Sequence, residues 1–187
     1  MTKRILSLLM LALIITACAS RENESAPEAS SAASTTAAPM NDAEIVNLLM
    51  TVNTEEMNLA KLGKKQAQNK RVREFAAHMM NRHAKNNDEA TKLRDREQIK
   101  LSETTPSNRV KIVTEESIEL MKKMKGKDFD RAYMEVQVDL HQKTLEKLET
   151  SLIPNAQNME LKTMLQKTKG EVEQHLQMAQ TLQSAVQ

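Results

Sequence analysis

The residues in this sequence that could carry chemistry are a few polar side chains on otherwise apolar helical stripes. Glu56, His83 and His141 each continue the stripe of a predicted helix, at the steps of three, four or seven residues that share one helix face. A buried carboxylate or imidazole is costly unless it is paired. We therefore expect these three groups to meet one another, or water, inside the protein.

The position of each residue along its helix predicts which of them can meet. Measured from a turn expected near residue 68, Glu56 lies about 12 residues down its helix and His83 about 15, and His141 falls near the middle of its own helix. At a rise of 1.5 Å per residue, these three lie within about 5 Å of one level. The same count puts His175 level with Tyr133 and about 12 Å from His141. We therefore expect His175 to pair with Tyr133.

Two kinds of chemistry fit the predicted cluster of Glu56, His83 and His141. A buried hydrogen-bond network that fixes the register of the helices is the simpler hypothesis, and it requires no cofactor. Alternatively, one carboxylate and two imidazoles could hold a single zinc, copper or iron ion, and nearby methionines such as Met79 would suit Cu(I). A ferritin-type di-iron centre needs Glu-x-x-His motifs. None is expected, because the residues three before the four histidines are Phe75, Met80, Val138 and Val172.

The remaining motifs and the charge balance exclude several functions. No nucleophile elbow, glycine-rich phosphate loop or paired-acid motif is present, so the sequence predicts no enzyme. Without Lys3 and Arg4, which belong to a predicted signal peptide, 25 basic residues stand against 25 acidic ones. A chain with no basic surplus, no Trp, one Tyr and two Phe is poorly suited to bind nucleic acid. A partner, if there is one, would be another envelope protein.

Helical periodicity predicts the long elements that position these residues. Asn41 and Glu44 have the spacing of a capping box, so the first helix should begin there and end between residues 66 and 69. The second should carry His83 and end before Lys100. Two further long helices, carrying His141 and His175, follow later in the chain.

The connection between the second and third long helices is unusually long and has helical signals of its own. Pro106 should open a shorter helix that Gly126 closes, and Asp128 should cap the next long helix. Pro154 should end that helix, and the last should start near Asn155. The sequence thus predicts an all-α domain, a ferritin-like four-helix bundle with a helical crossover between helices 2 and 3.

The N-terminus predicts export and lipid attachment. Residues 1–17 combine a positive start, a short apolar core and small residues before a cleavage site, as in a secretory signal peptide. Ile15-Thr16-Ala17-Cys18 resembles a bacterial lipobox, which implies that Cys18, the one cysteine of the chain, becomes lipidated. Residues 18–40 should form a disordered tether and residues 41–187 the folded domain. We expect a lipid-anchored outer-membrane protein that faces the periplasm.

A family resemblance rests on three motifs. These are Val72-x-x-Phe75-Ala76-x-x-Met79-x-x-x-His83, Phe129-Asp130-x-x-Tyr133-x-x-x-Gln137-x-x-x-His141 and His175-Leu176-x-x-Ala179. They resemble a family of bacterial periplasmic ferritin-like domains of unknown function, whose members are often called predicted outer membrane proteins. The resemblance covers about residues 41 to 184. It implies a fold and a compartment, but no activity.

Overall fold

The computed structural model describes residues 39–187, so the predicted signal peptide, Cys18 and most of the predicted tether lie outside the described residues. The described part is all-helical, as expected. Its helices are α1 (Asp42–Gln66), α2 (Lys70–Arg96), α3 (Thr105–Met121), α4 (Gly126–Lys147) and α6 (Met159–Ala185). A π-helical turn, η1 (Leu148–Leu152), and a short α5 (Ile153–Asn155) extend α4.

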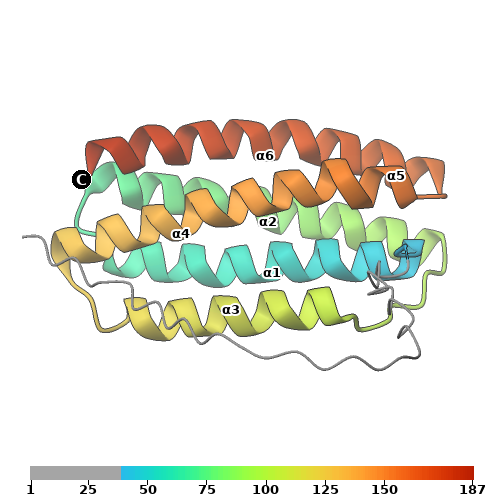
Figure 1. Ribbon diagram of the computed structural model, residues 1–187, viewed down its shortest axis with the longest axis horizontal. Coiled ribbons are helices and arrows are strands. Elements are labelled where there is room, and N and C mark those ends of the chain that lie inside the picture. The colour runs from blue at the N-terminus through green and yellow to red at the C-terminus, as the bar shows by residue number, and fades with distance from the viewer. Residues whose placement is uncertain (1–38) are drawn as a thin grey trace, which may run out of the picture. The chain divides into compact units, whose positions relative to one another are not determined.

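The five long helices lie side by side along one axis (Figure 1). Helices α1 and α2 form one antiparallel hairpin, and α4 and α6 form a second. Helix α3 packs along α1 and also touches α4, and it carries the chain back along the bundle between α2 and α4. The segment between the second and fourth helices is therefore helical, as its proline and apolar spacing predicted.

Local chemistry explains most of the helix ends. The side chain of Asn41 accepts a hydrogen bond from the Glu44 amide at 3.0 Å, and the Glu44 carboxylate accepts one from the Asn41 amide at 2.9 Å. This reciprocal pair is the predicted capping box. Helix α3 begins with a similar pair between Thr104 and Ser107, and Pro106 lies in its first turn, where a missing N–H is harmless.

Three predicted helix ends were wrong. Gly126 begins α4, with a φ of 61°, instead of closing α3, and Asp128 lies in the first turn of α4 instead of capping it. Pro154 ends its helix nearly as predicted, because the π-helical turn leads into the short α5, which stops at Asn155, one residue after the proline. The third wrong boundary is the start of α6, which lies at Met159, four residues later than predicted, with Asn158 as its cap.

A repeated Ala-Gln-Asn triplet relates the two hairpins. It precedes α2 at residues 67–69 and α6 at residues 156–158. In the first turn, Asp130 of α4 accepts hydrogen bonds from the amides of residues 68 and 69, at 2.9 and 2.7 Å. In the second, Asp42 of α1 accepts bonds from the amides of residues 157 and 158, both at 2.8 Å. Each hairpin therefore fixes the start of the other's second helix.

Two apolar clusters form the core, one towards each end of the bundle. The first contains Leu59, Met79, Tyr133 and Ala179, and the second contains Leu49, Ala90, Leu148 and Val172. Met40, the last residue of the predicted tether, is buried with the second cluster. One polar residue on each of four helices lies between a residue of one cluster and a residue of the other. These residues are Glu56 on α1, His83 on α2, His141 on α4 and His175 on α6. The core is thus interrupted by a polar layer.

Candidate metal centre

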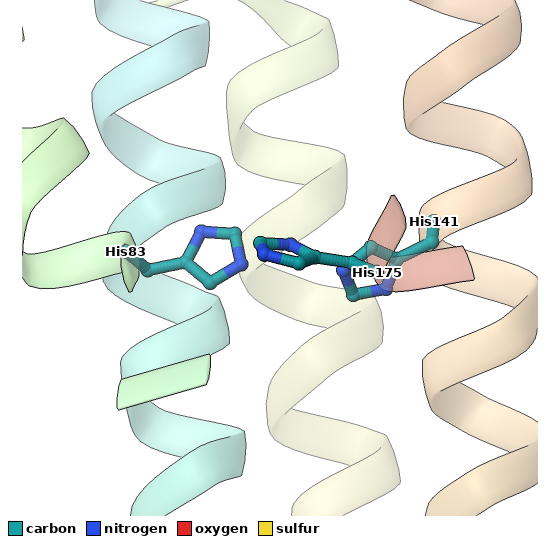
Figure 2. A group of neighbouring side chains, drawn as sticks. All are labelled: His83, His141 and His175. Carbon is teal, nitrogen blue, oxygen red and sulfur yellow. The ribbon is translucent and has the colours of Figure 1, made fainter. Parts of the chain in front are cut away.

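Three histidines converge in this polar layer. His83 comes from α2, His141 from α4 and His175 from α6, and their rings face one another in the middle of the bundle (Figure 2). One ring nitrogen of each lies within 4.8 Å of one ring nitrogen of both others. All three side chains are buried, at 4%, 2% and 1% exposed.

Hydrogen bonds fix the protonated nitrogen on two of the rings. His83 Nδ1 donates to the Asn53 amide oxygen at 2.9 Å, and His141 Nδ1 donates to the Gln137 carbonyl oxygen at 2.8 Å. Since both partners are acceptors, a neutral ring must carry its proton on Nδ1 and a lone pair on Nε2. Neither Nε2 atom has a hydrogen-bond partner, and His175 Nδ1 also has none.

The surroundings hold two of the imidazoles, those of His83 and His175, in their neutral form. Burial lowers the pKa of His83 well below the ordinary value of 6.5, and the neighbouring His141 and His175 rings lower it further. Burial, followed by the nearby His141, lowers the pKa of His175 to about 3. At neutral pH these two rings are uncharged, which is the form in which imidazole binds a metal.

A carboxylate and an amide lie behind His141. Gln137 donates from its side chain to Glu56 at 3.0 Å, and the other Glu56 oxygen lies 3.8 Å from His141 Nδ1. Glu56 therefore faces the proton-bearing side of the ring, away from Nε2. It is placed to orient His141, a role that outer carboxylates have around metal-binding histidines.

An ion pair next to the three rings ties α2 to α6. Arg82 and Asn86 of α2 both donate to the carboxylate of Glu171 on α6, at 2.6 and 2.9 Å. Glu171 stands one turn before His175, and the two donors flank His83 in the sequence. The contact therefore sets the axial register of two of the three histidines.

The structure brings the predicted Glu56, His83 and His141 into one neighbourhood and adds His175 to it. The predicted pair of Tyr133 with His175 does not form. Tyr133 stacks on Phe129, with ring centroids 5.9 Å apart, and lies against Gly63, and its buried hydroxyl has no hydrogen-bond partner.

The late start of α6 explains why the sequence missed His175. His175 lies 16 residues after Met159, while His141 lies 14 residues before Asn155. At 1.5 Å per residue these lengths are about 24 and 21 Å, so the two histidines are nearly level. The signal that could have shown the late start is local: Asn158 caps α6 at the end of the same Ala-Gln-Asn triplet that precedes α2.

Two other predicted participants do not face the unpartnered ring nitrogens. Met79 packs in the first apolar cluster, and Glu56 takes the outer position described above. His78, which was not singled out as a site residue, is exposed, but its ring meets the edge of the His175 ring with centroids 5.5 Å apart.

The arrangement suits a transition metal. Zinc bound by imidazole has Zn–N distances of about 2.0–2.1 Å, so tetrahedral ligand nitrogens lie about 3.3 Å apart. Ring nitrogens that lie within 4.8 Å of one another need only small side-chain rotations to reach that spacing. Three ligands leave a fourth coordination position for water or another small group.

Comparison with known proteins places the chain in a family. A family model described as Domain of unknown function (DUF4142) matches residues 26–182. The chain belongs to that family. No curated protein and no solved structure matches it. Among the described helices, none combines the length and apolar character needed to cross a membrane.

Proposed function

We propose that this chain is a lipid-anchored, non-catalytic protein of the cell envelope whose helical domain binds one transition-metal ion through His83, His141 and His175. The observation that carries the proposal is the convergence of three buried imidazoles with one unpartnered nitrogen on each ring.

A purely structural network accounts poorly for these nitrogens. An unmade hydrogen bond at a buried polar atom costs about 1–3 kcal/mol, so a cluster that existed only to fix helix register would have partnered its acceptors. One water molecule can donate to two of the three nitrogens, and it reaches all three only if His175 carries its proton on Nδ1 and donates to the water oxygen. One metal ion satisfies all three at once. For this reason the metal-binding hypothesis is preferred to the hydrogen-bond network that the sequence first suggested.

The donor set favours zinc or copper. Imidazole suits zinc, copper, iron and nickel, and the affinity of a nitrogen site rises towards Cu²⁺ along the divalent series, with Zn²⁺ after it. Glu56 does not face the unpartnered nitrogens, which disfavours the oxygen-rich coordination of a di-iron centre.

The fold and the compartment complete the proposal. Two antiparallel hairpins, joined by a helix that returns along the bundle, support a ferritin-like four-helix bundle in which α3 is the crossover. The lipobox-like Ile15-Thr16-Ala17-Cys18 after a short apolar segment supports an acyl anchor at Cys18, with the domain in the periplasm on the outer membrane.

Metal binding is tested by titrating the mature, untagged chain with zinc, copper and nickel after EDTA treatment, using calorimetry and elemental analysis. We expect one ion per chain. His83→Ala, His141→Ala and His175→Ala should each weaken binding at least tenfold, and His78→Ala, which changes an exposed histidine, should leave it within about twofold. Absence of stoichiometric uptake, or equal uptake by the three buried-site variants, would overturn the metal-binding function.

Anchoring is tested separately. Cys18→Ser should release the chain from the membrane fraction or leave an uncleaved precursor. Unchanged fractionation together with an unchanged mature mass would contradict lipid attachment and would leave the metal-binding proposal intact.

A further inference from the structure

A largely apolar cavity opens beside the three histidines, beneath α3. Its volume is about 340 Å³, within the range of roughly 300–1,000 Å³ typical of small-molecule sites. Its walls come from α1, α2, α3, α4, η1 and α6, and His83, His141 and His175 form part of its lining. The apolar side chains that line it include Leu49, Val52, Val110, Leu140, Leu148 and Val172.

The helix that covers the cavity is loosely packed. Of the 17 residues of α3, only Ser107, Thr114 and Met121 are buried. Val113 lines the cavity and is still 41% exposed. The Thr114 hydroxyl is buried and has no hydrogen-bond partner. A helix with so few buried side chains can move locally and admit a ligand to the cavity.

The cavity wall carries exposed cations. Arg109 on α3, and Lys143 and Lys147 on α4, all line the cavity and are exposed. Lys143 forms an ion pair with Asp139 at 2.7 Å. Within residues 39–187, no ion pair is formed by Arg109 or Lys147. The lining also contains the acids Glu55, Glu56, Asp139 and Glu171, of which Asp139 and Glu171 are paired with Lys143 and Arg82. The two unpaired cations at the exposed side of the apolar cavity are complementary to a molecule with an apolar body and an anionic head.

We propose that this cavity binds an aliphatic monocarboxylate of medium chain length. The hydrocarbon chain lies between α1, α3 and α4, and the carboxylate lies at the exposed side, against Arg109 and Lys147. The three histidines line the same cavity, but the placement uses no ion at them. The ligand is therefore tested in EDTA, where a failure to bind leaves the metal-binding proposal intact.

The proposal is tested by calorimetric titration of the mature chain in EDTA with octanoate, decanoate and laurate, below their micelle concentrations. We expect saturable 1:1 binding that tightens about fourfold for each added methylene, as burial of a hydrocarbon chain requires. Decyltrimethylammonium, which has a cationic head, should bind at least tenfold more weakly than decanoate. Absence of saturable binding, or equal binding of the two head groups, would overturn the proposal.

Variants of α3 locate the ligand. Val110→Trp fills the cavity and should weaken decanoate binding more than tenfold. Ile112→Trp places the same side chain two residues on, at a position 55% exposed and outside the cavity lining, and should leave binding within twofold. Circular dichroism melts show whether both variants fold. Unchanged binding by a folded Val110→Trp variant would refute the assigned cavity.

Charge reversal locates the head group. Arg109→Glu combined with Lys147→Glu should weaken decanoate binding about tenfold and leave decanol binding unchanged. Lys127→Glu, an exposed cation on α4 away from the cavity, is the control. Decanoate binding that survives the double reversal, or that appears only when zinc is added, would overturn the placement of the carboxylate at these cations.

Discussion

Replacing His175 with leucine separates the stability of the metal-free chain from its capacity to bind metal. His175 is 1% exposed, and its Nδ1 atom has no partner. Removing an unmade buried hydrogen bond relieves roughly 1–3 kcal/mol, and a leucine of similar size adds apolar burial at some cost in shape. We therefore expect His175→Leu to raise the free energy of unfolding in EDTA by about 1–2 kcal/mol.

With zinc, we expect the wild-type chain to be more stable than the His175→Leu variant. At a free concentration of 100 times Kd, a bound ion adds about 2.7 kcal/mol to the free energy of unfolding of the wild-type chain. For a domain of this size each kcal/mol shifts Tm by roughly 2–4 °C, so zinc should raise the wild-type Tm by about 5–11 °C. His175→Leu lacks one of three ligands and should gain little. The variant should melt higher than the wild type in EDTA and lower with zinc.

Thermal melts followed by circular dichroism, in EDTA and then with zinc or copper, measure both effects. His78→Leu is the matched control, because it changes an exposed histidine on α2 that touches the His175 ring only at its edge. The reasoning is refuted if His175→Leu is destabilised by more than about 1 kcal/mol in EDTA, which would mean that the imidazole makes favourable interactions. It is equally refuted if zinc stabilises the variant as much as the wild type.

Three further predictions concern the fold. Asp130→Ala removes the acceptor of two backbone amides and should lower the free energy of unfolding by about 2–4 kcal/mol in denaturant titrations, while exposed Asp128→Ala should cost no more than about 0.5 kcal/mol. Gly63→Ala places a Cβ 2.6 Å from the buried Tyr133 ring. The cost of overpacking, about 1–3 kcal/mol, should exceed the gain in helix propensity of about 1 kcal/mol, so the variant should be less stable than the wild type. A rise in Tm would contradict this. In EDTA, acidification should destabilise the chain. The lowered pKa values of His83 and His175 mean that the unfolded state binds more protons below about pH 6.5, so the free energy of unfolding falls by up to about 1.4 kcal/mol per pH unit for each ring, and for His175 down to about pH 3. Unfolding measured between pH 7 and 5 should show a smaller slope for His175→Leu.

Much of the helical framework follows from the sequence because its causes are local. The capping box at Asn41 and Glu44 and the proline at 106 act over a single turn, so their positions mark helix starts directly. Apolar periodicity likewise shows which face of each helix is buried. For the same reason the inward direction of His83 and His141 could be predicted, since their own helices determine it.

The candidate site depends on register between helices, and local signals do not specify that register. Asp42 holds the turn before α6 by accepting hydrogen bonds from two backbone amides more than 100 residues away in the sequence. These long-range contacts set the height of His175, and so decide that it joins the other two histidines and not Tyr133.

The sequence by itself determined that the domain is helical, which faces of its helices are buried, and that three of those faces carry a histidine. Only the tertiary structure decided that these histidines meet with one unpartnered nitrogen each, and that α3 leaves an apolar cavity beside them. Periodicity and capping act within a few residues, whereas the distance between groups on different helices depends on packing and turn contacts along the whole chain.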